Sequence, residues 1–289
     1  MNLCNPKVVR ALMEEAGITF RREFGQNFLI DQTVPEDIAD ACAERQDMLI
    51  LEIGPGIGCL TQELALRYER VVAVEIDNGL IPVLSKTMAE YDNVRIVHGD
   101  VMKIDLATLI AEEAEGREVA VCANLPYYIT TPILMRLLEC GVRFSSITVM
   151  VQNEVAARLA ASPGKGDYGA ITAVLAYYGT VKKLFTVPAG SFMPAPKVNS
   201  AVIRMDLYRK PVYQPKDEKL FFEVIRAAFG QRRKTLVNAL GVLGGFEKED
   251  IQTAVTACGF EPTVRGERLS CEDFVRLSDS LTALREEKI

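Results

Sequence analysis

The sequence has only one histidine, His98, among its 289 residues. A Ser-His-Asp triad and a cysteine–histidine zinc site both need histidine beside suitable partners, and no such pattern surrounds His98. Seven cysteines are present, but they are scattered and form no C-x-x-C pair. An odd, scattered set is typical of reduced thiols rather than of a disulfide framework. We therefore expect no metal site, and we expect His98 to be structural.

Long apolar runs are also missing. No stretch of about 18 apolar residues is present, so no membrane span is indicated. The first residues, M-N-L-C-N-P-K, lack the apolar segment of a signal peptide. No extended heptad pattern indicates an obligate coiled-coil dimer. We expect a cytoplasmic protein that has no membrane partner and acts as a monomer.

The charge of the chain is unevenly distributed. The formal net charge is −6, which argues weakly against nucleic-acid binding. Residues 182–234, however, carry twelve Lys or Arg against four acids, a net charge of +8 that leaves −14 for the remainder. A basic face on an acidic protein can hold phosphates, and a solvated, salt-bridged surface is the alternative.

Apolar segments alternate with helical patterns from residue 31 to about 180. Strands are expected at 48–53, 71–76, 94–98, 118–123 and 146–152, with helices such as 60–68, 80–91 and 133–140 between them. Apolar strands separated by helices indicate a parallel sheet covered on both faces. The sequence therefore predicts a doubly wound, Rossmann-like α/β domain.

The pattern changes in the last third of the chain. Two β-rich segments, 181–187 and 200–207, are joined by a Pro-rich loop and predict an antiparallel hairpin at the edge of the sheet. Helices are then expected at 219–229, 234–240, 248–258 and 271–286, with Ser270 capping the last one and Asp273 in its first turn. We place a domain boundary near residue 209, with an α/β domain at 1–209 and a small all-α domain at 210–289. A chain of this length accommodates two domains.

A glycine loop follows the first expected strand. Gly54 and Gly56, in the run G-P-G-I-G at 54–58, permit a tight turn and the close approach of a ligand to the backbone. Glu75 ends the next strand, where a carboxylate can accept hydrogen bonds from ribose hydroxyls. Asp100 follows the third strand and can accept one from an adenine amino group. The spacing differs from the G-x-G-x-x-G of dehydrogenases, and an adenosine ligand satisfies all three positions.

The fourth strand runs into N-L-P-Y-Y-I-T at 124–130. The side chain of Asn124 and the carbonyl of Leu125 are hydrogen-bond acceptors, Pro126 fixes the backbone, and Tyr127 offers a flat face for stacking. Such a set suits the exocyclic amine of a nucleobase, whose lone pair is delocalised into the ring. Two acceptors on the amine protons favour a pyramidal nitrogen, so that positioning rather than a strong base carries the rate. Packing residues at a strand end are the alternative.

These motifs together resemble the rRNA adenine dimethyltransferase family of class I S-adenosylmethionine-dependent methyltransferases. The resemblance covers nearly the whole chain. Its most specific motifs are N-L-P-Y-Y-I-T and F-M-P-A-P-K-V-N-S at 192–200. The others are F-G-Q-N-F-L at 24–29, L-E-I-G-P-G-I-G-C-L-T at 51–61, V-E-I-D at 74–77, G-D at 99–100 and F-G-Q-R-R-K-T-L-V-N-A-L at 229–240.

The resemblance implies a role for each matching residue. Asn124 and Leu125 would hold the target amine, Tyr127 would stack on the base, and Phe192 would cover its other face. One departure is Q-N-E at 152–154, where Q-K-E is expected, which puts a basic contact at Asn153 in doubt. Contacts to the cofactor S-adenosyl-L-methionine are implied for Asn27, Leu29, Gly54, Gly56, Glu75, Asp100 and Asn124.

The resemblance also implies the substrate. It would be two adjacent adenines in a hairpin loop near the 3′ end of 16S rRNA, methylated in an immature 30S small ribosomal subunit. Single-stranded loops let adenines be splayed out, and phosphate contacts position the RNA. Two alternatives remain, a methyltransferase for adenine in DNA or large-subunit rRNA and a non-catalytic assembly or transcription factor. RNA contacts are expected from Lys197, Arg226, Arg232, Arg233 and Lys234.

Overall fold

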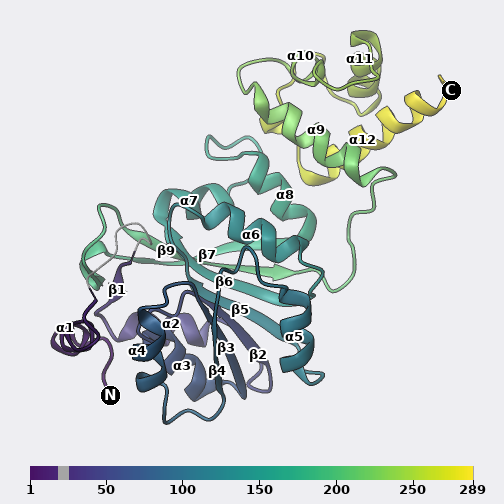
Figure 1. Cartoon of the computed structure of the whole chain (residues 1–289). Helices are drawn as coiled ribbons and strands as arrows, with labels where there is room; N and C mark the ends of the chain where they lie inside the picture. Colours follow the sequence, from purple (N-terminus) through teal and green to yellow (C-terminus); the bar gives the residue numbers. More distant parts are fainter. Residues whose placement is uncertain (19–25, 289) are drawn as a thin grey trace. The chain divides into compact units, whose positions relative to one another are not determined.

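The computed structural model describes residues 1–18 and 26–288 of the chain, which form two compact units (Figure 1). The first unit comprises Met1–Ala156 and Lys182–Leu207, and the second comprises Ala157–Val181 and Tyr208–Ile289. Within the described residues, no helix combines the length and the apolar character needed to cross a bilayer.

The first unit is built on a seven-stranded sheet with the order β4-β3-β2-β5-β6-β9-β7. The strands from β4 to β6 are parallel, and β9 is antiparallel to β6. All five residues of β2 are buried, and since successive side chains point to opposite faces, the sheet is covered on both. The strands are β2 (Leu49–Ile53), β3 (Arg70–Glu75), β4 (Val94–His98), β5 (Val119–Asn124), β6 (Phe144–Gln152), β7 (Gly179–Val187) and β9 (Ser200–Leu207).

The predicted fold class is confirmed: a mixed sheet in which the strands from β4 to β6 are parallel, β9 is antiparallel to β6, and β7 follows β9 at the edge. The loop between β7 and β9 contains the short strand β8 (Phe192–Met193), which pairs with β1 (Phe28–Leu29) in a separate two-stranded sheet. This pairing joins residues far apart in sequence, and the alternation of apolar residues did not indicate it.

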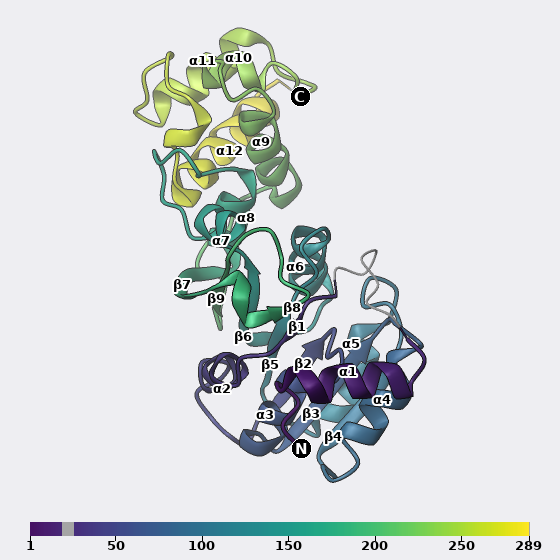
Figure 2. The ribbon, with the colours of Figure 1, turned by 90° about the vertical axis from the view of Figure 1, so that its left-hand side faces the viewer.

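Helices cover the first sheet. Helix α1 lies beside α4 in both ribbon views (Figures 1 and 2), and Lys86 Nζ of α4 donates a hydrogen bond to Glu15 Oε1 of α1 at 2.7 Å. Asn5 caps α1 by accepting from the N–H of Lys7 at 2.9 Å, and a proline follows at the first helical position. The helices are α1 (Pro6–Glu15), α2 (Thr33–Asp40), α3 (Cys59–Arg67), α4 (Leu80–Thr87), α5 (Leu106–Ala114), α6 (Thr130–Glu139) and α7 (Asn153–Leu159).

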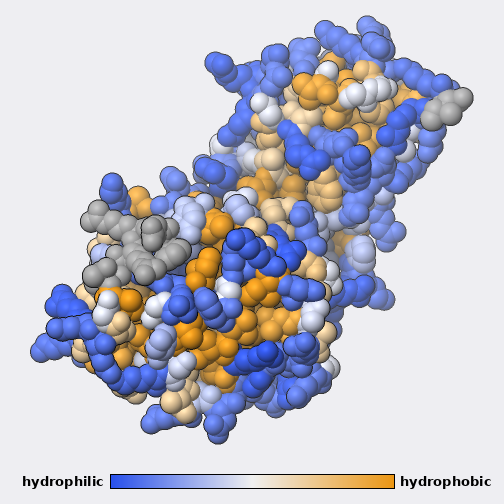
Figure 3. Space-filling view, viewed as in Figure 1, coloured by the Kyte–Doolittle hydropathy of each residue, from blue (hydrophilic) through white to orange (hydrophobic). Residues whose placement is uncertain are grey.

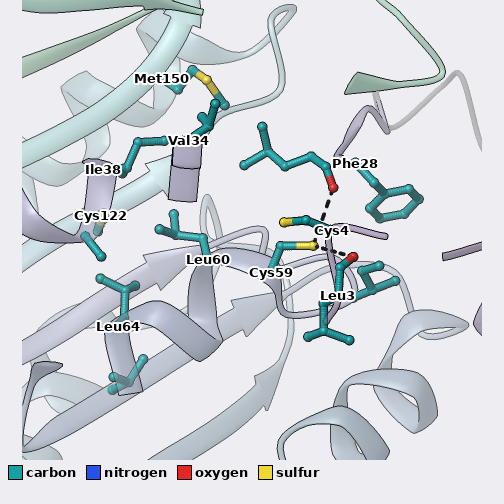
Figure 4. Close-up of a cluster of buried hydrophobic side chains, with 14 of the residues drawn as sticks. Leu3, Cys4, Phe28, Val34, Ile38, Cys59, Leu60, Leu64, Cys122 and Met150 are labelled. Carbon is teal, nitrogen blue, oxygen red and sulfur yellow. Dashed lines mark hydrogen bonds between the residues drawn. The ribbon is translucent and has the colours of Figure 1, made fainter. Parts of the chain in front are cut away.

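A hydrophobic core fills the space between the sheet and its neighbouring helices (Figure 4). It brings the N-terminal residues Leu3 and Cys4 against Cys59, at the start of α3. The thiol of Cys59 contacts the carbonyl oxygen of Leu3 at 3.2 Å. All seven cysteines are free thiols, and five of them are buried. The core thus anchors the N-terminal segment directly beside the glycine loop.

The second unit is helical. It contains α8 (Ala170–Tyr178), α9 (Glu218–Gly230), α10 (Leu236–Leu240), α11 (Lys248–Ala257) and α12 (Cys271–Glu286). Ser270 caps α12 as predicted, because its hydroxyl accepts from the N–H of Asp273 at 3.2 Å while Asp273 Oδ2 accepts from the N–H of Ser270 at 2.9 Å.

The boundary between the units lies at Leu207–Tyr208, two residues before the position expected from the sequence, but the second unit also takes in Ala157–Val181. That segment packs against α9 and α12, and the Tyr168 hydroxyl donates to the carbonyl of Leu269 at 2.8 Å. The sequence suggested that this segment belongs to the sheet domain, because it precedes a strand of the sheet.

Candidate active site

Four candidate residues lie at the carboxyl ends of four adjacent strands. Strands β4, β3, β2 and β5 are adjacent and parallel, so their carboxyl ends lie side by side. Gly54 follows β2, Glu75 ends β3, Asp100 follows β4 and Asn124 ends β5. The topology therefore brings together what the sequence places up to 70 residues apart.

The glycine loop adopts a backbone that favours glycine. Gly54, Gly56 and Gly58 have φ angles of 68°, 63° and 96°, in the left-handed region. A Cβ on Gly56 would lie 3.0 Å from Cε1 of Phe28, and one on Gly58 would lie 2.8 Å from Cε of Met88. The loop can therefore present its backbone to a ligand while β1 packs closely against it.

A cavity opens beside this loop, with an empty volume of about 850 Å³ that includes its open mouth. The N-L-P-Y segment, the glycine loop and Glu75 form parts of the same wall. The predicted residues that line it are Asn27, Leu29, Gly54, Gly56, Glu75, Asn124, Leu125 and Tyr127. This one cavity therefore contains the predicted cofactor contacts other than Asp100, together with three of the four residues expected to act on the target.

A second, mostly apolar hollow of about 420 Å³ adjoins the first, and Asp100 is on its wall. Gly54, Ile76, Pro126 and Tyr128 line both. Two of these are large exposed hydrophobic side chains, Ile76 at 45% and Tyr128 at 63%. Figure 3 shows hydrophobic surface gathered on the face of the first unit that is turned toward the viewer. A mostly apolar hollow whose lining includes the carboxylate of Asp100 suits a purine ring that carries an amino group.

Glu75 is held in place by the backbone around it. Its carboxylate accepts hydrogen bonds from the N–H of Gly56 at 3.1 Å and from the N–H of Asp77 at 2.8 Å. Burial raises the pKa of Glu75, while these backbone hydrogen bonds lower it. Asp100 is similarly fixed, because its Oδ1 accepts from the N–H of Met102 at 2.9 Å. Both carboxylates are thus oriented before a ligand arrives.

Sequence reasoning missed Glu52, which also lines the cavity. Its side chain is 1% exposed, and its Oε2 has no hydrogen-bond partner among the described residues. Burial raises the pKa of Glu52 to about 8, with a lowering contribution from Thr61 and a raising one from the charge of Glu75. The sequence did place an acid inside the apolar strand M-L-I-L-E-I. Burial of a carboxylate without a compensating partner is unfavourable, so this position indicated a possible functional role.

The N-L-P-Y segment is anchored at several points. The N–H of Leu125 donates to the carbonyl of Met150 on β6 at 3.2 Å. The Thr130 hydroxyl donates to the carbonyl of Pro126 at 3.2 Å. The hydroxyl of Tyr127 lies 2.6 Å from Oγ of Ser200, and burial raises the pKa of Tyr127. The segment is therefore a fixed turn in which Tyr127 forms part of the cavity wall.

The structure does not bring Phe192 to the cavity. Its side chain is 2% exposed and belongs to the hydrophobic core. The antiparallel register that places Phe192 opposite Leu29 in the β1–β8 pair accounts for this burial. In this arrangement Phe192 pairs with the strand residue Leu29, whereas the family resemblance implied that it covers the target base.

The remaining motif residues occupy defined places. In F-G-Q-N-F-L, residues 24 and 25 lie outside the described residues, while Gln26 Nε2 donates to Asp77 Oδ2 at 2.8 Å. Asn153, at the position of the departure, accepts a hydrogen bond from Lys183 Nζ at 2.7 Å. His98 is exposed at the end of β4 and lines neither cavity. In the part of the chain that the structure describes, no His, Cys, Asp or Glu cluster is arranged to hold a metal ion.

The predicted RNA contacts divide between the two units. Lys197 is exposed on the Pro-rich loop of the first unit, and Arg226, Arg232, Arg233 and Lys234 are exposed on the second. Arg232 also has a structural role, because its Nη2 donates to the carbonyls of Gly166 at 2.9 Å and Tyr168 at 3.1 Å.

Known proteins share this combination of motifs and fold. The model of the family described as ribosomal RNA adenine dimethylase matches residues 17–283. The chain belongs to this family. It is 47% identical over 287 residues to the ribosomal RNA small subunit methyltransferase A of Geobacillus thermodenitrificans, with 98% of each chain covered. It is 46% identical over 283 residues to the protein of the same name from Shouchella clausii, with 97% of this chain and 96% of the relative covered.

Solved structures give the same result for the fold. The 23S rRNA methyltransferase ErmE superposes with a TM-score of 0.68 at 25% identity, covering 89% of this chain and 100% of ErmE. A dimethyladenosine transferase from Plasmodium falciparum gives a TM-score of 0.75 at 23% identity, with 91% and 98% covered. The predictions of a class I methyltransferase fold and of an rRNA adenine dimethyltransferase are confirmed. The family and the fold imply a methyl donor of the S-adenosylmethionine type.

Proposed function

We propose that the protein transfers methyl groups from S-adenosyl-L-methionine to the exocyclic nitrogens of two adjacent adenines in a 3′-terminal hairpin loop of 16S rRNA. Each adenine receives two methyl groups. The observation that carries this proposal is the shared wall of one cavity: the N-L-P-Y residues that suit a nucleobase amine stand beside the glycine loop and Glu75, which suit a nucleoside.

The cavity fits the proposed donor. Glu75 would accept hydrogen bonds from the ribose hydroxyls, and Asp100 in the adjoining hollow would accept one from the adenine amino group. Oε2 of Glu52 is buried and has no hydrogen-bond partner among the described residues, so it could accept a hydrogen bond from the ammonium group of a methionine moiety. Asn27, Leu29, Gly54 and Gly56 complete the wall. When bound, this donor supplies a methyl group made electrophilic by the adjacent sulfonium.

The catalytic residues would act on the target amine by position. The side-chain oxygen of Asn124 and the carbonyl of Leu125 accept the amine protons, which favours a pyramidal nitrogen with a localised lone pair. Tyr127 stacks on the adenine and fixes its plane, so the nitrogen is held in line with the methyl group. After the first transfer one amine proton remains, and a single acceptor suffices for the second. Much of the rate then comes from alignment and from acceptors that are already oriented.

The helical second unit and the Pro-rich loop would hold the RNA. We propose phosphate contacts from Lys197, Arg226, Arg233 and Lys234, with Arg232 contributing beside its structural role. The small subunit is the favoured substrate because relatives at 46–47% identity carry that name, whereas the match to the 23S enzyme is at 25%. Under the same proposal the protein acts as a cytoplasmic monomer on immature 30S particles, with its RNA-binding domain near residues 210–289.

The test uses small ribosomal subunits from cells that lack this modification. These subunits are incubated with the protein and S-adenosyl-L-methionine, and methylated nucleosides are then located by mass spectrometry. We expect dimethyladenosine at two adjacent loop positions with the wild type and none with Asn124→Ala. Transfer only to DNA or to large-subunit RNA would overturn the substrate. Tight subunit binding without any transfer would make the protein a non-catalytic assembly factor instead.

A further inference from the structure

A hydrogen bond joins the two most specific motifs of the chain. The hydroxyl of Tyr127, in N-L-P-Y-Y-I-T, lies 2.6 Å from Oγ of Ser200, the last residue of F-M-P-A-P-K-V-N-S. The two residues are 73 positions apart in the sequence. Ser200 is completely buried, with an exposed fraction of 0%, whereas Tyr127 is half-buried and lines the cavity.

Ser200 is firmly anchored. It begins β9 and pairs with Gln152 of β6 in the antiparallel register. The preceding residue, Asn199, is held on both sides: its carbonyl accepts from the N–H of Asn153 at 3.0 Å, and its Oδ1 accepts from the N–H of Ala189 at 3.0 Å. The hydroxyl of Ser200 is therefore a fixed point at the end of the Pro-rich loop.

Tyr127 is less constrained by its own backbone. It lies in the turn after β5, where the N–H of Ile129 donates to the carbonyl of Pro126 at 3.2 Å. This hydrogen bond fixes the turn but does not involve the side chain of Tyr127, so the position of the ring needs a contact of its own. The phenolic oxygen lies on the axis about which the ring turns. A hydrogen bond there therefore fixes the direction of the ring axis through χ1, and it acts on the ring plane only through the in-plane preference of the hydroxyl hydrogen.

We propose that Ser200 is a positioning residue that holds the Tyr127 ring in place for the target adenine. This inference rests on the proposed function, in which that ring stacks on the base. Stacking depends on where the ring lies, and a small swing of the ring about χ1 would displace the amine from its line with the methyl donor. The Pro-rich motif thus contributes to the target site through Ser200, although its Phe192 is buried in the core.

The test is a double-mutant cycle on Ser200→Ala, Tyr127→Phe and the double variant. A neutral hydrogen bond contributes enough to change kcat/KM for the RNA by roughly 5- to 10-fold. If Ser200 acts only through the tyrosine hydroxyl, each single variant loses this factor and the double variant loses no more. Losses that multiply in the double variant would overturn the inference. The affinity for the methyl donor should stay the same in all three.

A matched control removes another buried hydroxyl from the same strand pair. Ser146 on β6 is 1% exposed and donates to the carbonyl of Cys42 at 2.8 Å. Ser146→Ala should lower the unfolding temperature much as Ser200→Ala does, yet leave kcat/KM for the RNA unchanged. An equal loss of kcat/KM in this control would reduce the effect of Ser200 to general stability and contradict the inference.

A measurement without RNA separates this inference from the proposed function. Tyrosines labelled with ¹³C at the ring carbon that bears the hydroxyl give one NMR signal each, and Tyr127→Phe identifies the signal of Tyr127. Ser200→Ala should shift that signal selectively, and an unmoved signal would show that the contact is absent in solution. If the wild-type protein transfers no methyl group to the RNA, the proposed function is overturned instead.

Discussion

Gln26 Nε2 donates a hydrogen bond to Asp77 Oδ2 at 2.8 Å, and this contact ties the segment before β1 to the end of β3. Asp77 is 3% exposed, and its Oδ1 accepts from the N–H of Gly79 at 2.9 Å. Its own N–H donates to Glu75. One buried carboxylate therefore connects the N-terminal wall of the cavity with the residue proposed to hold the ribose.

Gln26→Ala should weaken donor binding more than it slows chemistry. The N-terminal wall would lose one anchor, so we expect the Kd for S-adenosylhomocysteine to rise about 5- to 10-fold. The fold reduction in kcat at saturating donor should be less than half of the fold rise in Kd. Calorimetric titration gives the Kd. Gln62→Ala is the control, because Gln62 donates to the Tyr91 hydroxyl at 2.9 Å outside the cavity. A fall in kcat with an unchanged Kd would contradict this prediction.

Glu52 should make the stability of the protein depend on pH. Its pKa in the folded state is about 8, raised mainly by burial from an ordinary value of 4.5. Between these values the unfolded chain has lost the proton while the folded chain keeps it, so the free energy of unfolding falls as pH rises. The slope from this one group is at most about 1.4 kcal/mol per pH unit. Glu52→Gln stays neutral at every pH and removes this slope.

Urea unfolding from about pH 3 to pH 8 measures the effect, with Glu113→Gln as a control of opposite sign at the acid end. Burial raises the pKa of Glu113, but hydrogen bonds from Arg70 and Arg95 outweigh it and lower the pKa. Glu113 therefore stabilises above its unfolded pKa, and this contribution is lost as pH falls into the acid range. Wild type and Glu52→Gln with parallel profiles would show that Glu52 is ionised in the folded protein.

The parallel strands and the strand-end residues could be predicted from the sequence because each depends on local pattern. Apolar runs define β2 and β5, and glycines, Glu75 and Asn124 fall directly at strand ends. A parallel sheet then places those ends together without any knowledge of side-chain contacts.

Other features depend on contacts between distant segments, which local pattern does not encode. The pairing of β1 with β8 buries Phe192, and the packing of 157–181 on α9 and α12 moves that segment into the second unit. Glu52 was missed because its position within an apolar strand indicates burial but not the cavity beside it. These are the places where tertiary contacts override the sequence pattern.

Gly56→Ala should impair donor binding through two effects. The φ of 63° is unfavourable for alanine, and the added Cβ would lie 3.0 Å from the Phe28 ring. Gly245→Ala is the matched control, because Gly245 has a φ of 84° and no atom within 4 Å of the added Cβ. Both should lose about 1 kcal/mol of stability, but only Gly56→Ala should raise the donor Kd, by about tenfold or more. Equal Kd values would remove the glycine loop from the binding site.

Arg232 and Arg233 should differ although they are neighbours in the basic cluster. Arg233 is exposed, and within residues 1–18 and 26–288 its side chain forms no hydrogen bond or ion pair, whereas Arg232 holds the carbonyls of Gly166 and Tyr168. Arg233→Ala should weaken binding to small subunits and leave the unfolding temperature unchanged. Arg232→Ala should lower both the affinity for small subunits and the unfolding temperature, because it also removes the hydrogen bonds that hold the loop before α8.

Filter binding at several salt concentrations separates these effects. Removal of one phosphate contact should reduce the slope of log affinity against log salt by about 0.7 to 0.9 in either variant, because each loses one cation from the RNA interface. An unchanged slope in Arg233→Ala would mean that this side chain does not contact phosphate, and the positive charge of residues 182–234 would then need another explanation. An unchanged slope together with a lowered unfolding temperature in Arg232→Ala would assign that arginine to the loop alone.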